Sequence, residues 1–420
     1  MNLFFSVKRT IIGAVLVLLV AGGWVAWKNL EARNQPIKVG ILHSLTGTMA
    51  ISETSVRDAT LLAIEELNAA GGLLGRRIEP VIADGKSDGP TFAREAERLI
   101  TQEQVAVIFG CWTSASRKTV KPVFEKYDHL LFYPLQSEGL EQSPNIIYTG
   151  AAPNQQIIPA VKWSFDHLGK RFFLVGSDYV FPRTANAIIK AQVLALGGEI
   201  VGEEYLRLGS REVAAVVQKI ATARPAVILN TINGDSNVAF FEALRRAGIT
   251  PAQIPTVSFS LGENELCHMK TSEMAGDYAA WNYFQSVDSP ENHRFVKAFR
   301  ARFGQGRVTD DPMEAAYFGV RMWARAVTTA GTTDPRVVRK ALHYRSLAAP
   351  EGIVTIDAKT QHVWKVVRVG KILADGQFEI VWSSRDPVLP IPYPAFHTQA
   401  EWESFLTELQ SGWGGAWASP

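Results

Sequence analysis

Short apolar runs alternate along this chain with longer segments in which apolar residues recur every three to four positions. The first pair is the run at residues 37–42 and the segment at residues 54–68, which ends at Gly71-Gly72. A short apolar run predicts a buried strand, and a period near 3.6 predicts an amphipathic helix that stops at glycine. The chain therefore opens with the strand and helix of a βαβ unit.

The same alternation continues to about residue 133 and then starts again. The first series predicts strands at residues 78–83, 105–109 and 130–133, and helices at residues 91–101 and 114–126. The second series predicts strands at residues 171–176, 199–205, 226–230 and 256–258, and helices at residues 183–196, 212–223 and 236–247. This order predicts an α/β fold with parallel sheets and helices on both faces. Each series has a paired-glycine stop after its first helix, which indicates two similar lobes.

Segments rich in turn residues indicate where the chain passes between the lobes. Residues 143–159 are rich in Pro, Asn and Gly, and residues 281–289 form a second candidate crossing. Two further helices, at residues 292–303 and 313–330, should return to the first lobe. Residues 354–382 alternate like antiparallel strands.

These patterns divide the chain into four parts. We expect residues 1–35 to be a leader, residues 36–150 with 284–355 to form lobe 1, residues 151–283 with 356–393 to form lobe 2, and residues 394–420 to be a C-terminal tail. The hinges should lie near residues 150, 283 and 355. The tail carries one short amphipathic stretch at residues 401–409.

The composition fits an ordinary globular protein of two domains. Of 420 residues, 47% are hydrophobic and 20% are charged, and domains typically have about 150 residues. Lys and Arg number 43 against 41 Asp and Glu, and no run of like charges is long enough to follow a phosphate backbone. We therefore expect no nucleic-acid partner.

The N-terminus predicts export. Lys8 and Arg9 precede residues 10–27, an uncharged stretch closed by Lys28. As a helix the stretch would reach about 27 Å, close to the hydrocarbon thickness of a bilayer. The basic flank places everything after residue 28 across the membrane, which in a bacterium is the periplasmic side. The stretch fits equally a cleaved signal peptide and an uncleaved inner-membrane anchor, because tryptophans stand where a signal peptidase prefers small residues. No cysteine is near enough for a lipid anchor.

The chain lacks the motifs of known enzyme classes. HExxH, GxSxG, a GxxxxGK phosphate loop, CxxC pairs and GxGxxG are all absent, and the eight histidines show no metal-ligand spacing. Cys111 and Cys267 are too few for a disulfide framework, and two free thiols are favoured over one bridge. We therefore expect a protein that is not an enzyme and holds no cofactor or metal.

Polar and aromatic residues gather in the loops that follow the predicted strands. Ligands of open parallel sheets bind beyond the carboxyl ends of the strands. The first-lobe candidates are Glu53 after the first strand, Trp112 and Ser114 in the loop at residues 110–118, and a set after the next strand: Tyr133, Gln136 and Glu138. Helix capping and core packing are the alternative roles for hydroxyls and aromatics in such loops.

The second lobe presents two equivalent loops. Tyr179 lies in the loop at residues 176–183, and Asp235 lies in the loop at residues 233–237. Because the carboxyl ends of both sheets face one cleft, we expect the two sets of side chains to oppose each other across it.

Five segments carry a resemblance to a known family. They are ILHSLTGTMA at residues 41–50, GCWTSASRK at residues 110–118, YTGAAPNQQ at residues 148–156, GSDYVFPR at residues 176–183, and WNYF at residues 281–284. Over residues 36–393 the chain resembles the urea and short-chain amide substrate-binding proteins of ATP-binding-cassette (ABC) transporters. The resemblance implies a type I periplasmic binding protein fold, with two Rossmann-like lobes joined by three crossing strands.

The resemblance also implies where the ligand lies. Carried over residue by residue, it implicates Trp112, Ser114, Tyr133 and Tyr179, with a second group in less direct correspondence: Gln136, Glu138, Glu53, Asp235 and Tyr283. Ser137 departs from the family, because relatives usually have a tyrosine before Glu-Gly. This departure thins the loop and changes the expected pocket size.

The chemistry of an amide agrees with these residues. Urea has four N–H donors and one carbonyl, so it needs carboxylate or hydroxyl acceptors and at least one donor. Capture by closure of the lobes and delivery to an ABC permease is the leading hypothesis. The alternative is a membrane-linked amide sensor that controls a regulatory partner, with the anchor uncleaved. An amidase is disfavoured, because Ser114 has no His or Lys partner in its motif.

Overall fold

The computed structural model describes residues 35–419. The stretch at residues 10–27 lies outside this range, so its two interpretations both stay predictions. Among the helices of the described range, none is both long and apolar enough to cross a bilayer.

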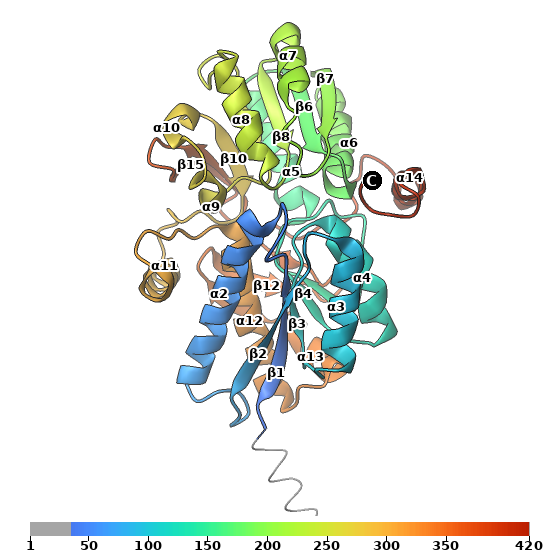
Figure 1. The fold of residues 1–420 in the computed structure, drawn as a ribbon, viewed down its shortest axis with the longest axis vertical. Coiled ribbons are helices and arrows are strands. Elements are labelled where there is room, and N and C mark those ends of the chain that lie inside the picture. The colour runs from blue at the N-terminus through green and yellow to red at the C-terminus, as the bar shows by residue number, and fades with distance from the viewer. Residues whose placement is uncertain (1–34, 420) are drawn as a thin grey trace, which may run out of the picture.

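Two lobes stack along the long axis of the molecule (Figure 1). Lobe 1 is built on a parallel sheet of five strands in the order β2-β1-β3-β4-β5. These strands are β1 (Ile37–His43), β2 (Ile78–Asp84), β3 (Ile108–Gly110), β4 (Leu131–Tyr133) and β5 (Ile146–Tyr148). The apolar residues of β1, β3, β4 and β5 are buried, which is why these strands appear in the sequence as continuous hydrophobic runs. The edge strand β2 leaves Ile82 exposed.

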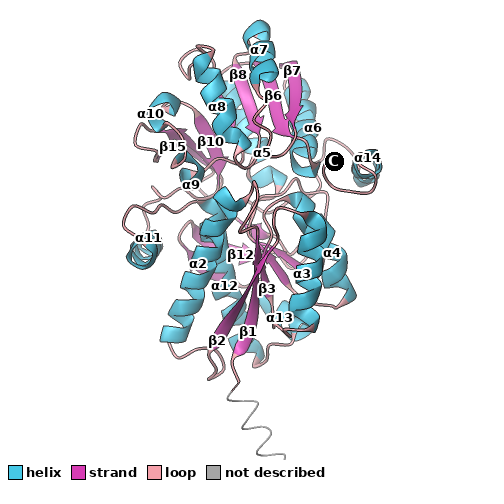
Figure 2. Ribbon diagram, in the orientation of Figure 1, coloured by secondary structure: helices cyan, strands magenta, loops and turns pink. Residues whose placement is uncertain are grey.

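Helices flank the lobe 1 sheet (Figure 2), and they come from two distant parts of the chain. They are α2 (Ala50–Ala69), α3 (Gly89–Thr101), α4 (Ser114–Lys126), and, after the chain returns, α11 (Pro290–Phe303), α12 (Asp311–Ala330) and α13 (Pro335–Leu342). Helix α12 packs along α2. A small antiparallel sheet of β11 (Ser346–Ala349), β12 (Gly352–Ile356) and β13 (Val363–Trp364) is attached to α12 through β11.

Lobe 2 holds a sheet of seven strands in the order β15-β14-β10-β9-β8-β6-β7. Its strands are β6 (Arg171–Ser177), β7 (Glu199–Leu206), β8 (Val227–Thr231), β9 (Thr256–Ser258), β10 (Tyr278–Trp281), β14 (Arg368–Ile372) and β15 (Phe378–Ser383). Strands β14 and β15 are antiparallel, and the rest pair in parallel.

The helical elements of lobe 2 complete the described structure. They are η1 (Pro153–Gln155), α5 (Ile157–His167), α6 (Val180–Ala195), α7 (Ala214–Ala223), α8 (Ser236–Arg246), α9 (Glu263–Leu266) and α10 (Thr271–Met274). The last helix, α14 (Gln399–Gly412), lies beside the level at which the lobes meet (Figure 1). The α/β fold class is confirmed.

Helix α2 begins at Ala50, four residues before the predicted start at residue 54. The first turn contains the buried polar residues Ser52, Glu53 and Ser55. These side chains face the other lobe, where Ser55 and the backbone carbonyl of Ile51 both bond to Asn264 of α9. A polar surface that is buried between lobes has no apolar periodicity. The hydrophobic pattern of the sequence therefore did not predict the first turn of α2.

Three connections join the lobes, and one buried cluster touches all of them. The Lys365 ammonium donates to the carbonyl of Thr149 at 2.9 Å and lies 3.1 Å from the Glu351 carboxylate. The Asp311 carboxylate accepts from the backbone N–H groups of Asn282 and Tyr283, each at 2.9 Å. The connections therefore lie at residues 149–152, 282–289 and 365–367. The third follows β13, which pairs with β12 on lobe 1, and so lies beyond the hinge expected near residue 355.

Candidate ligand-binding cleft

The loop after β3 lies on the lobe 1 side of the lobe interface, and we call this side, with the residues bonded to the loop, the first wall of the candidate cleft. A Cβ on Gly110 would lie 2.1 Å from the carbonyl oxygen of Leu42 on β1, so only glycine permits this close approach. Thr113 then caps α4 by accepting from the backbone N–H of Ser116 at 3.0 Å. The strand, the glycine and the cap together place Trp112 and Ser114 at the lobe interface.

Ser114 and Glu138 meet in a buried ionic network that also contains residues the sequence analysis did not single out. The Ser114 hydroxyl donates to one Glu138 oxygen, and Arg117 donates to the other at 3.0 Å and to the Ser114 oxygen at 2.9 Å. Arg117 also donates to Glu141 at 3.0 Å, and the Lys118 ammonium bonds to Glu141 at 3.0 Å. All five side chains are nearly inaccessible to solvent.

This network alters the pKa of Glu141. Burial raises the pKa of a carboxyl group, yet the adjacent Lys118 and Arg117 outweigh burial and hold the pKa of Glu141 below its ordinary value. Arg117 is three residues from Ser114 and therefore lies on the same face of α4. That spacing was the signal in the sequence that could have identified Arg117 as part of the site.

Tyr133 bonds within the first wall, and Gln136 bonds from the first wall to lobe 2. The Tyr133 hydroxyl donates to the carbonyl of Trp112 at 2.6 Å, and the Arg117 guanidinium lies 4.8 Å from the centre of the Tyr133 ring. Gln136 reaches across the lobe boundary and donates to the carbonyl of Phe259 at 2.9 Å and to the hydroxyl of Ser260 at 3.0 Å. Its amide oxygen is buried and has no partner in the described chain.

Glu53 and Tyr283 each have partners inside lobe 1 or its connections. One Glu53 oxygen accepts from the backbone N–H of Ser44 at 2.7 Å and lies 3.1 Å from the His43 ring. The Tyr283 hydroxyl bonds to Asn292 at 2.6 Å and to Thr309 at 2.8 Å. Tyr283 thus lies among α11 residues, and its hydroxyl is already engaged there.

Tyr179 and Asp235 lie on the lobe 2 side of the interface, which we call the second wall. Tyr179 is the residue immediately before α6 and is 2% exposed, yet its hydroxyl makes no hydrogen bond to any residue from 35 to 419. Asp235 precedes α8 and accepts from the hydroxyl of Thr48 on lobe 1. With the contacts of Gln136, this bond joins the two lobes directly.

Tyr179 of lobe 2 lies close to several titratable residues of lobe 1. Burial raises the pKa of Tyr179 well above its ordinary value, and the nearby Tyr133, Glu138 and Glu53 of lobe 1 raise it further, while Arg117 opposes them. Trp112 is 3% exposed, and its indole N–H donates to no group in the described chain. The structure therefore brings all of the nine candidate residues except Tyr283 to the lobe interface or to contacts across it, with two donors that have no partner among residues 35–419.

The two cysteines lie within the described range. Both thiols are free, with Cys111 buried and Cys267 exposed. Within residues 35–419, no group of three or more His, Cys, Asp and Glu side chains is arranged to hold a metal ion.

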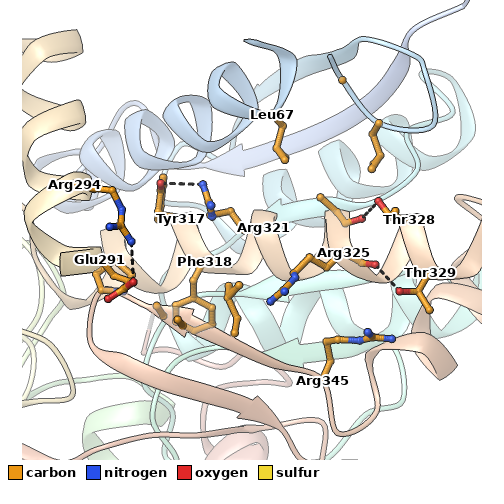
Figure 3. Close-up of a pocket in the computed structure, with 17 residues that line it drawn as sticks. Leu67, Glu291, Arg294, Tyr317, Phe318, Arg321, Arg325, Thr328, Thr329 and Arg345 are labelled. Atoms are coloured by element: carbon orange, nitrogen blue, oxygen red, sulfur yellow. Dashed lines mark hydrogen bonds and ion pairs between the residues drawn. The ribbon is translucent and has the colours of Figure 1, made fainter. Parts of the chain in front are cut away.

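A separate groove of about 720 Å³ lies on the outer side of lobe 1 (Figure 3). Its floor includes Leu67 and Phe318, and its rim carries the arginines Arg294, Arg321, Arg325 and Arg345. It is formed by α2, α11, α12 and β11, and none of the candidate residues lines it. The groove is therefore distinct from the cleft.

The fold is that of a two-lobed periplasmic binding protein of type I. The model of the family described as "Periplasmic binding protein domain" matches residues 37–399, and the chain belongs to this family. It is accordingly a binding protein and not an enzyme, as the sequence predicts. Membership of this family implies a location outside the cytoplasm.

Several known proteins are similar over most of their length. The chain is 24% identical to "Leu/Ile/Val-binding protein homolog 6" of Brucella melitensis, covering 78% of this chain and 85% of that one. A solute-binding protein of Rhodopseudomonas palustris solved with 4-hydroxybenzoate has a TM-score of 0.75 at 22% identity, covering 84% of this chain and 98% of that one. A branched-chain amino acid binding protein of Streptococcus pneumoniae solved with isoleucine has a TM-score of 0.73 at 20% identity, covering 85% and 100%.

One further similarity is local. A protein of Geobacillus stearothermophilus named "Limonene hydroxylase" is 37% identical over 120 residues, which is 29% of this chain. The chain spans only 22% of the length of that relative. The shared segment therefore carries nothing about the activity of the whole relative.

Proposed function

We propose that the protein captures urea or a short-chain amide between its lobes, outside the cytoplasm, and delivers it to the permease of an ABC transporter. The family accounts for the binding and transport part of this proposal. The choice of a small neutral amide rests on the resemblance of the five sequence segments and on the state of the charged groups beside the cleft.

The observation that carries the choice of ligand is the neutralisation of the cations at the first wall. Similar proteins have been solved with a benzoate and with an amino acid, both of which present a carboxylate. A buried carboxylate needs a cation or several donors. Arg117 and Lys118 are already paired with Glu138 and Glu141, so neither offers free charge to an anionic ligand.

The unengaged polar groups suit a neutral amide instead. Among residues 35–419 the Trp112 indole N–H and the Tyr179 hydroxyl have no acceptor, so they can donate to a carbonyl oxygen. The Gln136 amide oxygen and the Tyr179 oxygen likewise have no donor there and can accept from N–H groups. The aromatic rings would exclude water and so strengthen these bonds. Closure of the lobes would then trap the ligand.

Calorimetric titration tests the proposal. The chain from residue 36 onward is titrated with urea, acetamide, formamide, leucine and benzoate, first as the wild type and then as Tyr179→Ala. We expect saturable binding of urea or a small amide that Tyr179→Ala weakens at least about tenfold. Tyr344→Ala, which removes a tyrosine that is 66% exposed, is the matched control and should bind like the wild type. Preference for leucine or benzoate would refute the amide assignment while leaving the family intact.

A further inference from the structure

The chain continues past the residues that the family model matches and folds back to the mouth of the cleft. The family match ends at residue 399, where α14 has just begun. After α14, residues 413–419 run to the loop that carries Tyr179. We call residues 413–419 the C-terminal clasp.

The clasp pairs with the main chain on both sides of Tyr179. The carbonyl of Trp417 accepts from the backbone N–H of Val180 at 3.0 Å, and the backbone N–H of Ser419 donates to the carbonyl of Asp178 at 3.1 Å. Between them, Ala418 and Tyr179 form an antiparallel bridge. Val180 is the first residue of α6, so its N–H is one of the donors that the helix itself leaves free.

The same segment also touches lobe 1. The Lys118 ammonium, on α4, lies 5.0 Å from the centre of the Trp417 ring, within the range of a cation–π interaction. Lys118 belongs to the ionic network of the first wall. Trp417 therefore contacts lobe 1 with its side chain and lobe 2 with its backbone.

Helix α14 anchors the clasp. Trp402 is 2% exposed, and its indole donates to the carbonyl of Pro394 at 2.9 Å. Trp402 and Leu406 join an apolar cluster with residues of α6, and Trp413 and Trp417 pack against that cluster. The base of the tail is held by lobe 1, because the backbone N–H of Leu140 donates to the carbonyl of Pro392 at 2.9 Å.

We propose that Trp417 is a positioning residue for the ligand site, and that the C-terminal clasp holds the Tyr179 loop against lobe 1 and slows ligand release. The inference rests on the proposed function for its ligand, but its structural part concerns the lobes alone. With the main chain fixed at Asp178 and Val180, Tyr179 has little freedom to leave the cleft. Opening the lobes separates Lys118 from Trp417 or pulls the clasp away from α6.

The first experiment measures lobe separation without ligand. Spin labels are attached to the full chain through Gln102→Cys on lobe 1 and Thr222→Cys on lobe 2, both exposed positions, in a Cys267→Ser background. Electron–electron double resonance then compares wild type, Trp417→Ala, Trp417→Phe and Trp413→Ala. We expect Trp417→Ala to increase the open population several-fold, and Trp417→Phe, which keeps an aromatic ring, to restore most of the closed population.

The second experiment measures dissociation of radiolabelled urea and acetamide from the same proteins. Trp417→Ala should raise the dissociation rate constant about 5- to 10-fold with little change in the association rate constant. Trp413→Ala is the matched control, because it removes a tryptophan of the same tail that has no such contact with lobe 1.

The outcomes separate the clasp from the ligand assignment. If Trp417→Ala lowers the melting temperature but leaves the lobe distances unchanged, the clasp is only a structural part of lobe 2 and the inference is wrong. If neither urea nor acetamide binds to the wild type, the proposed ligand is wrong, and the ligand-free lobe distances still decide the role of Trp417.

Discussion

Glu138 and Glu141 on the lobe 1 side of the interface are buried beside Arg117 and Lys118, whereas Glu263 on the lobe 2 side is buried with no cation bonded to it among residues 35–419. Lys118 and Arg117 outweigh burial and lower the pKa of Glu141. Burial, reinforced by Glu265 and Asp311, raises the pKa of Glu263 to about 8. The pKa values of Glu141 and Glu263 thus shift in opposite directions at similar depth because their neighbours differ.

The tyrosines of the two lobes also differ, in whether their hydroxyl groups have a hydrogen-bond partner. The Tyr133 hydroxyl of lobe 1 is bonded to the carbonyl of Trp112, while the Tyr179 hydroxyl of lobe 2 is bonded to no described residue. The ionic network and Tyr133 of lobe 1 are therefore already paired within the described chain, whereas the Tyr179 hydroxyl of lobe 2 still lacks a partner. In this comparison the paired groups of lobe 1 provide a fixed platform, and the ligand would complete the contacts of Tyr179 together with those of Trp112 and Gln136.

Arg117→Met should give the largest effect on stability. It leaves Glu138 and Glu141 buried with only Lys118 to neutralise them, and breaking a buried ion pair on one side costs about 3–5 kcal/mol. Unfolding in guanidinium chloride measures the loss, since urea is a proposed ligand. Arg171→Met breaks the exposed pair with Glu199 and should cost less than about 1 kcal/mol. Equal losses in the two variants would contradict the platform interpretation of lobe 1.

Glu263→Gln should change how stability depends on pH. The pKa of this carboxyl is raised in the folded protein, so its contribution to stability is greatest below its ordinary pKa near 4.5 and is lost as the pH rises to about 8. The variant should therefore be more stable than the wild type by about 1–3 kcal/mol at pH 8 and show no gain at pH 4.5.

Unfolding free energies at pH 4.5, 6, 7 and 8 test this expectation. Glu242→Gln, at an exposed position of α8, is the control and should keep the wild-type slope. A wild-type slope in Glu263→Gln as well would show that Glu263 is ionised in the folded protein.

Tyr133→Phe and Tyr179→Phe should separate stability from binding. Tyr133→Phe leaves the buried carbonyl of Trp112 short of a donor and should reduce the unfolding free energy by about 1 kcal/mol. Tyr179→Phe removes a hydroxyl with no intramolecular partner, so it should leave stability unchanged and weaken amide binding by about 2- to 10-fold. Calorimetry and thermal unfolding are run on both variants. Loss of stability in Tyr179→Phe alone would reverse the roles assigned to the walls.

Thr48→Val should have the smallest effect. It removes the hydroxyl that donates across the cleft to Asp235, so the closed form loses one half-exposed hydrogen bond. We expect affinity to fall about threefold with no change in melting temperature. Thr54→Val, whose hydroxyl bonds within α2 to the carbonyl of Ala50, should not alter affinity. An unchanged affinity in Thr48→Val would show that this bond does not contribute to closure.

The sequence predicted elements best where one face or both faces pack on apolar surface. Helix α4 and strand β9 have the predicted bounds of residues 114–126 and 256–258. Strand β10 was not predicted and ends at Trp281, where the expected crossing segment at residues 281–289 begins, and α13 was not expected at all. The strand has only four residues and borders the hinge, and the helix is eight residues long, so each offers too few positions to establish a period.

The candidate site was only partly accessible from the sequence. Trp112 and Tyr179 follow strands, and that position in a parallel sheet predicts a place in the cleft. The buried roles of Arg117 and Lys118 were missed, because a pair of basic residues on a helix usually indicates a solvated face. Their partners Glu138 and Glu141 lie more than twenty positions away in the chain, a separation that carries no local signal.

By itself the sequence determined the alternation of strands and helices, and with it the two-lobed α/β fold, because hydrophobic periodicity and glycine stops act over a few residues. The loops that form the cleft also follow from the sequence, since parallel strands end on one edge. Only the tertiary structure decided which buried charges are neutralised, which hydroxyls are left without partners, and where the C-terminal clasp returns. Those properties depend on distances between groups that are remote in sequence, and electrostatic and hydrogen-bond energies are set by those distances.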